Sequence, residues 1–126
     1  MKTWIRFGFV ASALIALHAA PATGQTAAPA AVTSQAIAQG DSIFHGAGNC
    51  YACHGANAEG VVGPNLTDAE WIHGDGSYDF IVAMVTNGIP KEQSKSGIMM
   101  PPKGGSTITD EQVKQVAAYA YSLTHK

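Results

Sequence analysis

The sequence predicts an all-α domain in which three main helices form the frame. Apolar residues recur at spacings of three and four in three separate segments, which is the period of a helix that buries one face. No segment alternates apolar and polar residues as a half-buried strand does, and stretches rich in glycine and proline separate the three segments. A chain of 126 residues is long enough for one such domain.

The first helix is predicted over residues 34–45. Ile37, Asp41 and Phe44 follow one another at spacings of four and three, as residues on one side of a helix do. Residues 46–49 read Gly-Ala-Gly-Asn, and two glycines so close together favour a turn that ends the helix.

The second helix is predicted from about residue 77 to residue 87, between irregular stretches over 55–74 and 89–107. Gly88 and then Pro90 end it, which is the usual order of these residues at a helix C-terminus. Its apolar face is formed by Phe80, Ile81, Met84 and Val85.

The last helix has the clearest start signal. Thr109 is placed to cap it, and Gln112 three residues later completes a capping box. Ile108 and Val113 flank the cap in the positions of a hydrophobic staple. The apolar stripe that follows consists of Val113, Val116, Ala117, Ala120 and Leu123.

The first 24 residues are predicted to be a secretory signal peptide. Two cations in the first six residues precede an apolar run over 7–17, and small residues follow it, with cleavage expected after Ala22 or Gly24. The alternative is a retained membrane anchor, but the run is shorter than the roughly 20 residues that a spanning helix needs. We therefore expect an exported, periplasmic protein whose mature form has no membrane span.

The mature chain is predicted to consist of a flexible Ala/Thr/Pro arm, residues 25–33, and one domain, residues 34–126. Without the leader, five lysines face nine acidic residues, a balance of −4. Nucleic acid is a poor partner for such a chain, because its affinity comes mainly from cations that neutralise phosphates. We expect a monomer.

Residues 50–54 read Cys-Tyr-Ala-Cys-His, the C-x-x-C-H spacing that attaches a c-type haem. On one helical turn Cys50 and Cys53 can each bond a vinyl group of the haem as a thioether. His54 can then turn a ring nitrogen onto the iron. We therefore predict one covalently bound haem c, with the porphyrin and its proximal ligand fixed by one short segment.

Three other uses of the two cysteines fit the sequence less well. A thioredoxin-like dithiol starts a helix that follows a strand, and no strand is predicted here. A structural zinc site needs four ligands, and the other histidines of the mature chain, at positions 45, 73 and 125, offer no second pair. A plain disulfide can form in an exported protein, but it leaves His54 unexplained.

An electron-transferring haem takes a second strong-field ligand, and methionine in that role raises the potential. Met84 lies on the apolar face of the second helix, where core packing is the expected role. His73 and His125 are expected in a surface loop and at a frayed terminus. This leaves Met99 and Met100 as the candidates.

The two methionines lie in an irregular segment that can pass over the far face of the porphyrin. Met100 comes 46 positions after His54. Neighbouring residues of an extended segment point opposite ways, so one of the two methionines faces the iron. Pro101 favours an extended conformation at Met100. The residues alone do not decide which of Met99 and Met100 is the distal ligand.

From about Ala38 to Leu123 the chain resembles the small bacterial class I cytochromes c. Gly40 and Phe44 resemble the glycine and the aromatic residue of that family's first helix, with Tyr119 as the aromatic partner on the last helix. The resemblance implies a cytochrome c fold, with three main helices around one covalently bound haem.

Residues 63–66, Gly-Pro-Asn-Leu, are similar to the loop that follows the haem motif in this family. The resemblance implies that the carbonyl oxygen of Pro64 accepts a hydrogen bond from His54, which would fix the histidine tautomer and raise its basicity. In the family the distal ligand commonly precedes a proline, as Met100 does, so the resemblance favours Met100 over Met99.

The implied function is outer-sphere electron transfer, in which the iron cycles between ferrous and ferric while both axial ligands stay in place. We expect no enzymatic activity, because the sequence shows no evident acid–base pair and the expected coordination leaves the iron no open position.

More narrowly, residues 63–74 resemble the c-type domains attached to bacterial terminal oxidases and the soluble partners of quinoprotein dehydrogenases. Here Trp71 either packs on the haem edge and hydrogen-bonds a propionate, or fills the core.

The chain differs from the oxidase subunits in having one C-x-x-C-H motif rather than two and no expected spanning helix in its mature form. These differences favour a free carrier between redox partner proteins, a dehydrogenase and a terminal oxidase or reductase. The alternatives are a haem subunit held permanently by such an enzyme and a five-coordinate haem protein that binds a gas or performs peroxide chemistry.

Overall fold

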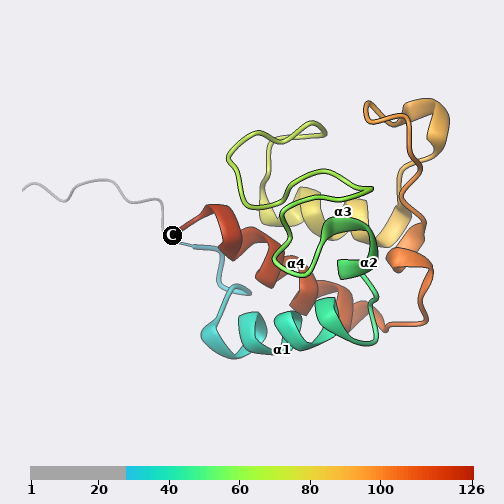
Figure 1. Ribbon diagram of the computed structural model, residues 1–126. Helices are drawn as coiled ribbons and strands as arrows, with labels where there is room; N and C mark the ends of the chain where they lie inside the picture. Colours follow the sequence, from blue (N-terminus) through green and yellow to red (C-terminus); the bar gives the residue numbers. More distant parts are fainter. Residues whose placement is uncertain (1–27) are drawn as a thin grey trace, which may run out of the picture.

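The computed structural model describes residues 28–126, and its secondary structure is helical as predicted (Figure 1). The predicted signal peptide and residues 25–27 of the predicted arm lie outside the described residues. Within residues 28–126 the β pairing is limited to one isolated antiparallel bridge, between Ile89 and Met100. The elements in chain order are α1 (Ser34–His45), α2 (Tyr51–His54), α3 (Tyr78–Asn87), the 3₁₀ turns η1 (Lys91–Gln93) and η2 (Pro102–Gly105), and α4 (Asp110–Thr124).

The three main helices begin where the sequence supplies a hydroxyl cap. The side chains of Thr33 and Ser77 accept hydrogen bonds from the first turns of α1 and α3. At α4 the predicted capping box is present, because Thr109 Oγ1 accepts from the Gln112 N–H at 3.2 Å and Gln112 Oε1 accepts from the Thr109 N–H at 2.9 Å. Each cap satisfies a backbone N–H that has no partner within its own helix.

The predicted flexible arm is attached to the domain over its described part. The N–H of Val32 donates to the carbonyl oxygen of Pro29 at 2.8 Å, which closes a turn, and Val32 packs against the core. Thr33 then caps α1. The half-buried valine thus links the end of this segment to the core, and the flexibility of the arm stays a prediction.

Helices α1 and α4 cross at Gly40, which is buried. A Cβ atom at this position would lie 2.1 Å from the carbonyl oxygen of Gln115, so the two helices approach as closely as they do because residue 40 has no side chain. One turn further along, the rings of Phe44 and Tyr119 pack with their centroids 5.3 Å apart, as the resemblance implied.

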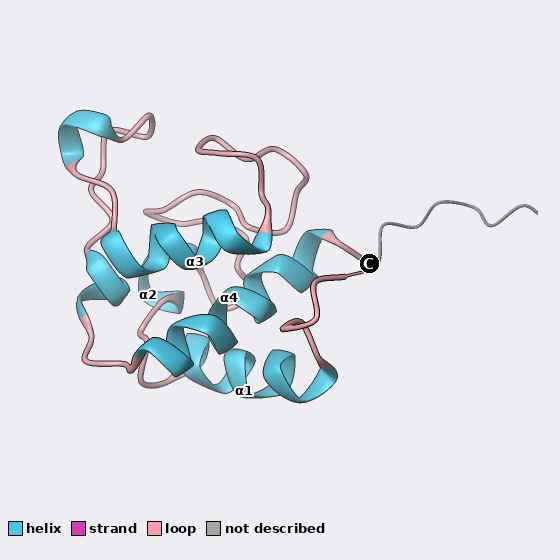
Figure 2. Ribbon diagram, turned by 180° about the vertical axis from the view of Figure 1, so that it is seen from behind, coloured by secondary structure: helices cyan, strands magenta, loops and turns pink. Residues whose placement is uncertain are grey.

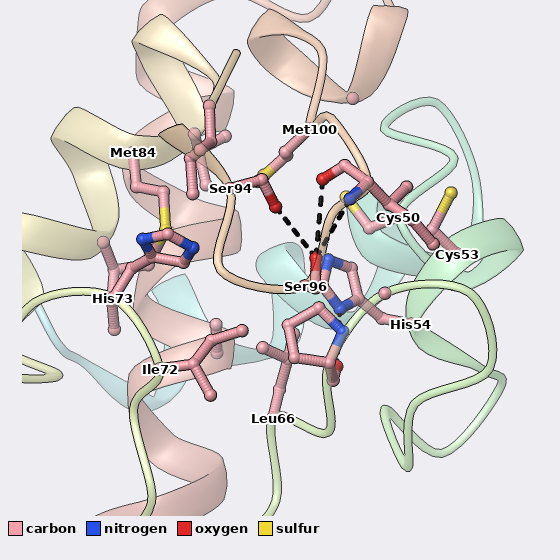
Figure 3. Close-up of a pocket in the computed structure, with 18 of the residues that line it drawn as sticks. Cys50, Cys53, His54, Leu66, Ile72, His73, Met84, Ser94, Ser96 and Met100 are labelled. Carbon is pink, nitrogen blue, oxygen red and sulfur yellow. Dashed lines mark hydrogen bonds between the residues drawn. The ribbon is translucent and has the colours of Figure 1, made fainter. Parts of the chain in front are cut away.

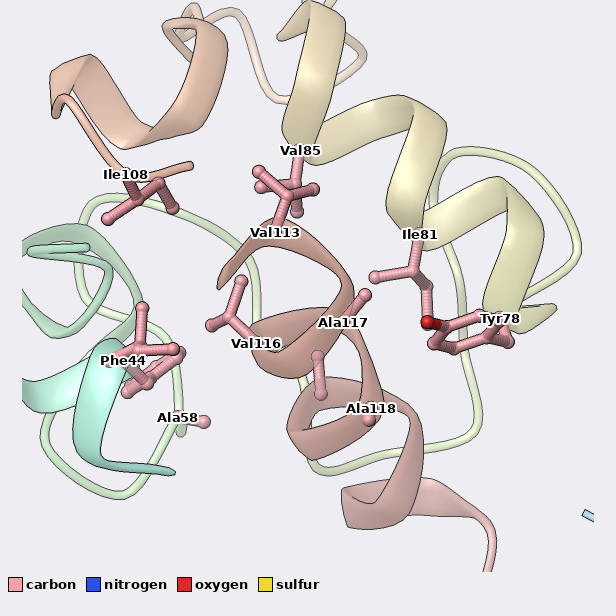
Figure 4. Packing of buried hydrophobic residues seen from close by; sticks show 12 residues of the cluster. Phe44, Ala58, Tyr78, Ile81, Val85, Ile108, Val113, Val116, Ala117 and Ala118 are labelled. Carbon is pink, nitrogen blue, oxygen red and sulfur yellow. The ribbon is translucent and has the colours of Figure 1, made fainter. Parts of the chain in front are cut away.

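The core lies on both sides of α4, which packs against α1 and α3 (Figure 4). Small residues on α4, Ala117 and Ala118, are fully buried and allow this close packing. The buried apolar residues are Ile43, Phe44, Ala58, Tyr78, Ile81, Val85, Ile108, Val113, Val116, Ala117, Ala118 and Ala120.

Two long loops lie beyond α3, on the side of the molecule away from α1 (Figure 2). They comprise residues 66–76 and 91–99. Among residues 28–126, the helices are all too short or too polar to cross a membrane.

Candidate haem site

A largely apolar cavity opens between α2, α3 and the two long loops (Figure 3). It contains about 1060 Å³ of space, part of it open to solvent. All the site residues predicted from the sequence line this cavity: Cys50, Cys53, His54, Pro64, Trp71 and Met100.

The ring of His54 is oriented by the loop that follows it. His54 ends α2, is only 8% exposed, and its Nδ1 lies 2.9 Å from the carbonyl oxygen of Pro64. Because a carbonyl oxygen can only accept, Nδ1 carries the proton and the lone pair of Nε2 is available to a metal. The hydrogen bond implied by the resemblance is therefore present.

The same burial keeps His54 neutral. Desolvation lowers the pKa of His54 below its ordinary value, and the hydrogen bond to Pro64 opposes this change only in part. A neutral imidazole is the form that binds a metal.

Backbone hydrogen bonds hold the loop against His54. The carbonyl oxygen of Cys53 accepts from the N–H groups of Val62 and Gly63, at 3.0 and 2.8 Å. A Cβ atom on Gly63 would lie 3.0 Å from Cε1 of His54, so this glycine allows the chain to pass directly beside the ring. The proximal side of the site is thus closed by main chain.

The two cysteines are thiols at the edge of the cavity. Neither forms a disulfide; Cys50 is half-buried and Cys53 is exposed. Burial raises the pKa of Cys50 to about 11, so the thiol is protonated at neutral pH. The pair meets the geometric demand of haem attachment, because both sulfurs come from the one helical turn that ends in His54.

Two hydrogen bonds hold the backbone of Met100, whereas the adjacent methionine is on the surface. The N–H groups of Ile89 and Met100 each donate to the carbonyl oxygen of the other residue, at 2.8 and 2.9 Å. The side chain of Met100 is half-buried and packs against the core. Met99 is 55% exposed, although it also lines the cavity.

Trp71 lines the cavity and also packs against the core, as expected of a core-filling residue, while its packing on a haem edge stays a prediction. Gly76 lies against the indole, because a Cβ atom there would be 2.4 Å from Nε1 of Trp71. The hydrogen bond to a propionate stays a prediction.

Two histidines have contacts that the sequence does not indicate. His73 lines the cavity, and its Nε2 accepts from the N–H of Lys95 at 3.2 Å, which joins the two long loops. His45 lies with Nε2 2.6 Å from the carbonyl oxygen of Ala56 and Nδ1 2.9 Å from that of Asp41. These two hydrogen bonds raise the pKa of His45, the bond to Ala56 more strongly, and they tie α1 to the segment after the cysteine motif.

The residues present fit a haem. The wall is largely apolar, one neutral imidazole has an available lone pair, and two thiols lie at the edge. Thioether side chains come from α3 (Met84) and from the irregular segment that follows (Met99 and Met100). Imidazole nitrogen and thioether sulfur are the axial donors of electron-transferring haems.

Comparison with known proteins places the chain in a family. A family model described as cytochrome c oxidase, cbb3-type, subunit III, matches residues 35–119. The chain belongs to this family. It is a c-type cytochrome.

Two curated relatives of this cytochrome are oxidase subunits. The cbb3-type cytochrome c oxidase subunit CcoP of Rubrivivax gelatinosus is 43% identical over 101 residues, which are 79% of this chain and 30% of CcoP. Subunit FixP of Rhizobium meliloti (strain 1021) is 38% identical over 90 residues, which are 69% of this chain and 27% of FixP. The cytochrome thus spans less than a third of the length of these two relatives.

A solved structure supports the same fold. Cytochrome CL of the marine methylotroph Methylophaga aminisulfidivorans matches with a TM-score of 0.60 and 26% identity, over 79% of this chain and 61% of that one. The predicted cytochrome c fold is confirmed.

Proposed function

We propose that this cytochrome transfers electrons through one haem c, bound covalently by Cys50 and Cys53, with His54 and Met100 as its axial ligands. The observation that carries the proposal is that these four residues, from two segments far apart in the sequence, line one apolar cavity. The hydrogen bond from Nδ1 of His54 to Pro64 supports the proposal further, because with the proton on Nδ1 the lone pair of Nε2 is available to the metal.

When bound, the haem iron supplies the one-electron couple between ferrous and ferric. The chain's own residues would hold the two iron ligands in position and form the surroundings of the haem. Pro64 holds the Nδ1–H of His54, and the pairing with Ile89 holds the main chain of Met100. With a haem in place, the largely apolar wall would limit the water around it, which disfavours the more highly charged oxidised state and so favours a raised potential.

Retained axial ligands favour fast electron transfer, because little rearrangement accompanies the change of oxidation state. On this proposal no substrate binds to the iron and the chain performs no catalysis of its own. We propose that it works as a periplasmic monomer, consistent with the predicted leader and with an acidic mature chain.

The proposed partner is a terminal oxidase, since the curated relatives are subunits of cbb3-type oxidases. The test is to mix the reduced protein rapidly with a purified cbb3-type oxidase and to follow its haem absorbance together with oxygen consumption. We expect oxidation at a rate that rises with oxidase concentration and stops when the oxidase is inactivated. Oxidation no faster than in buffer would show that the physiological acceptor is of another kind.

The second candidate is a haem subunit held permanently by an oxidase or dehydrogenase. The names of the relatives favour it, because CcoP and FixP are themselves subunits. Size-exclusion chromatography after mild detergent lysis separates the two: a free carrier elutes alone at the size of the monomer, whereas a permanent subunit elutes with its complex.

A further inference from the structure

The segment that carries Met100 is attached to the C-terminal end of α3. Helix α3 ends at Asn87, and Ile89, two residues later, forms the isolated bridge with Met100. The helix is anchored in the core, because Ile81 and Val85 are buried. The main chain of Met100 is therefore held by a rigid element at a distance of two residues.

Gly88, between the helix and the bridge, lies directly against the main chain of residues 100–102. Its φ is +68°, and a Cβ atom on it would lie 2.3 Å from the carbonyl oxygen of Met100, 2.7 Å from the nitrogen of Pro102 and 2.9 Å from the carbonyl carbon of Pro101. All three contacts are to main-chain atoms, which cannot turn aside as the end of a side chain can. Any side chain at position 88 must move this backbone.

We propose that Gly88 is a positioning residue for the distal haem ligand: the absence of a side chain lets the backbone of Met100 sit against the end of α3, where the bridge to Ile89 fixes it. This inference rests on the proposed function, because it takes Met100 as the ligand. A side chain at position 88 lifts the backbone that carries the thioether, lengthens or breaks the bond from sulfur to iron, and leaves the iron open to competing ligands.

The test compares Gly88→Ala with Gly97→Ala, a matched control in the same irregular region. Gly97 also has a positive φ, of +75°, but its Cβ would have no atom within 4 Å. Imidazole is titrated into the oxidised holoproteins, because it competes with the distal ligand for iron. We expect Gly88→Ala to bind imidazole about tenfold or more tightly than the unaltered protein, and Gly97→Ala to match the unaltered protein.

A second comparison shows whether the effect acts through Met100. In a Met100→Ala background the distal sulfur is gone, so adding Gly88→Ala should leave imidazole affinity unchanged. If Met100 is not the ligand, Met100→Ala alone leaves imidazole affinity at its original value, which contradicts the proposed function. If Met100→Ala raises the affinity and Gly88→Ala does not, only the positioning role of Gly88 is contradicted.

Should Gly88→Ala fail to fold, Ile89→Pro provides the same test. Proline removes the N–H that donates to Met100 and adds no atom at residue 88. Tighter imidazole binding is again expected, and unchanged affinity in a folded Ile89→Pro variant overturns the proposal. Equal effects of Gly88→Ala and Gly97→Ala overturn it as well, because a side chain that meets no atom would then act as strongly as one that meets the backbone of residues 100–102.

Discussion

Replacing both Cys50 and Cys53 by alanine is expected to yield a chain that retains no haem under denaturing conditions and does not fold. The cavity between α2, α3 and the long loops has a largely apolar wall, which the proposed haem would cover. Loss of the haem would expose this wall to water, and exposure of apolar surface is costly. Domains have only about 5–15 kcal/mol of stability.

Haem staining of a denaturing gel and thermal unfolding followed by circular dichroism measure the two effects. Each single variant is the control, since one thioether should keep the haem attached and the helices formed. A double variant that unfolds cooperatively near the temperature of the unaltered holoprotein would contradict the prediction, because the fold would then not need covalently attached haem.

Gly40→Ala is expected to destabilise the protein by about 2 kcal/mol or more, even though alanine is intrinsically the better helix former by ~1 kcal/mol. The added Cβ would lie 2.1 Å from the carbonyl oxygen of Gln115 and 2.8 Å from Cβ of Tyr119. The helices α1 and α4 must therefore separate, and the packing of Phe44 on Tyr119 is lost with them.

Chemical denaturation of the holoprotein measures this difference. Ser42→Ala, on the exposed side of the same helix, is the control and should change the free energy of unfolding by less than about 0.5 kcal/mol. If Gly40→Ala is as stable as the unaltered protein, the close crossing of α1 and α4 is wrong.

The helices could be predicted because their ends are encoded locally. Thr109 and Gln112 form a capping box from side chains three residues apart, and Gly88 ends α3 without help from distant residues. The 3₁₀ turn η2 (Pro102–Gly105) was not predicted. Its Lys103 has a φ of +54° and an ion pair to Asp110 at 2.8 Å, and sequence pattern gives no sign of either.

The site was predictable where its residues are adjacent in the sequence. Cys50, Cys53 and His54 form one motif, whereas the wall opposite them depends on contacts between irregular segments. His73 was expected to be a surface residue, yet it lines the cavity and accepts a hydrogen bond from Lys95, 22 positions away. No periodicity or spacing indicates such a contact.

Met99 and Met100 show most clearly that the sequence does not indicate contacts between distant segments. As neighbours before Pro101, Met99 and Met100 have nearly the same sequence environment. Their burial differs because the bridge to Ile89 fixes which of them packs against the core. A backbone pairing between residues 11 positions apart thus distinguishes them, and only the family resemblance had favoured Met100 before it.

The weak near-infrared iron–sulfur band of the oxidised protein shows whether Met100 binds the iron, because this band requires a methionine sulfur on ferric haem. We predict the band in the unaltered protein and in Met99→Ala, and its loss in Met100→Ala together with a lower midpoint potential. Absence of the band from the unaltered protein, or its loss in Met99→Ala with retention in Met100→Ala, would contradict ligation by Met100.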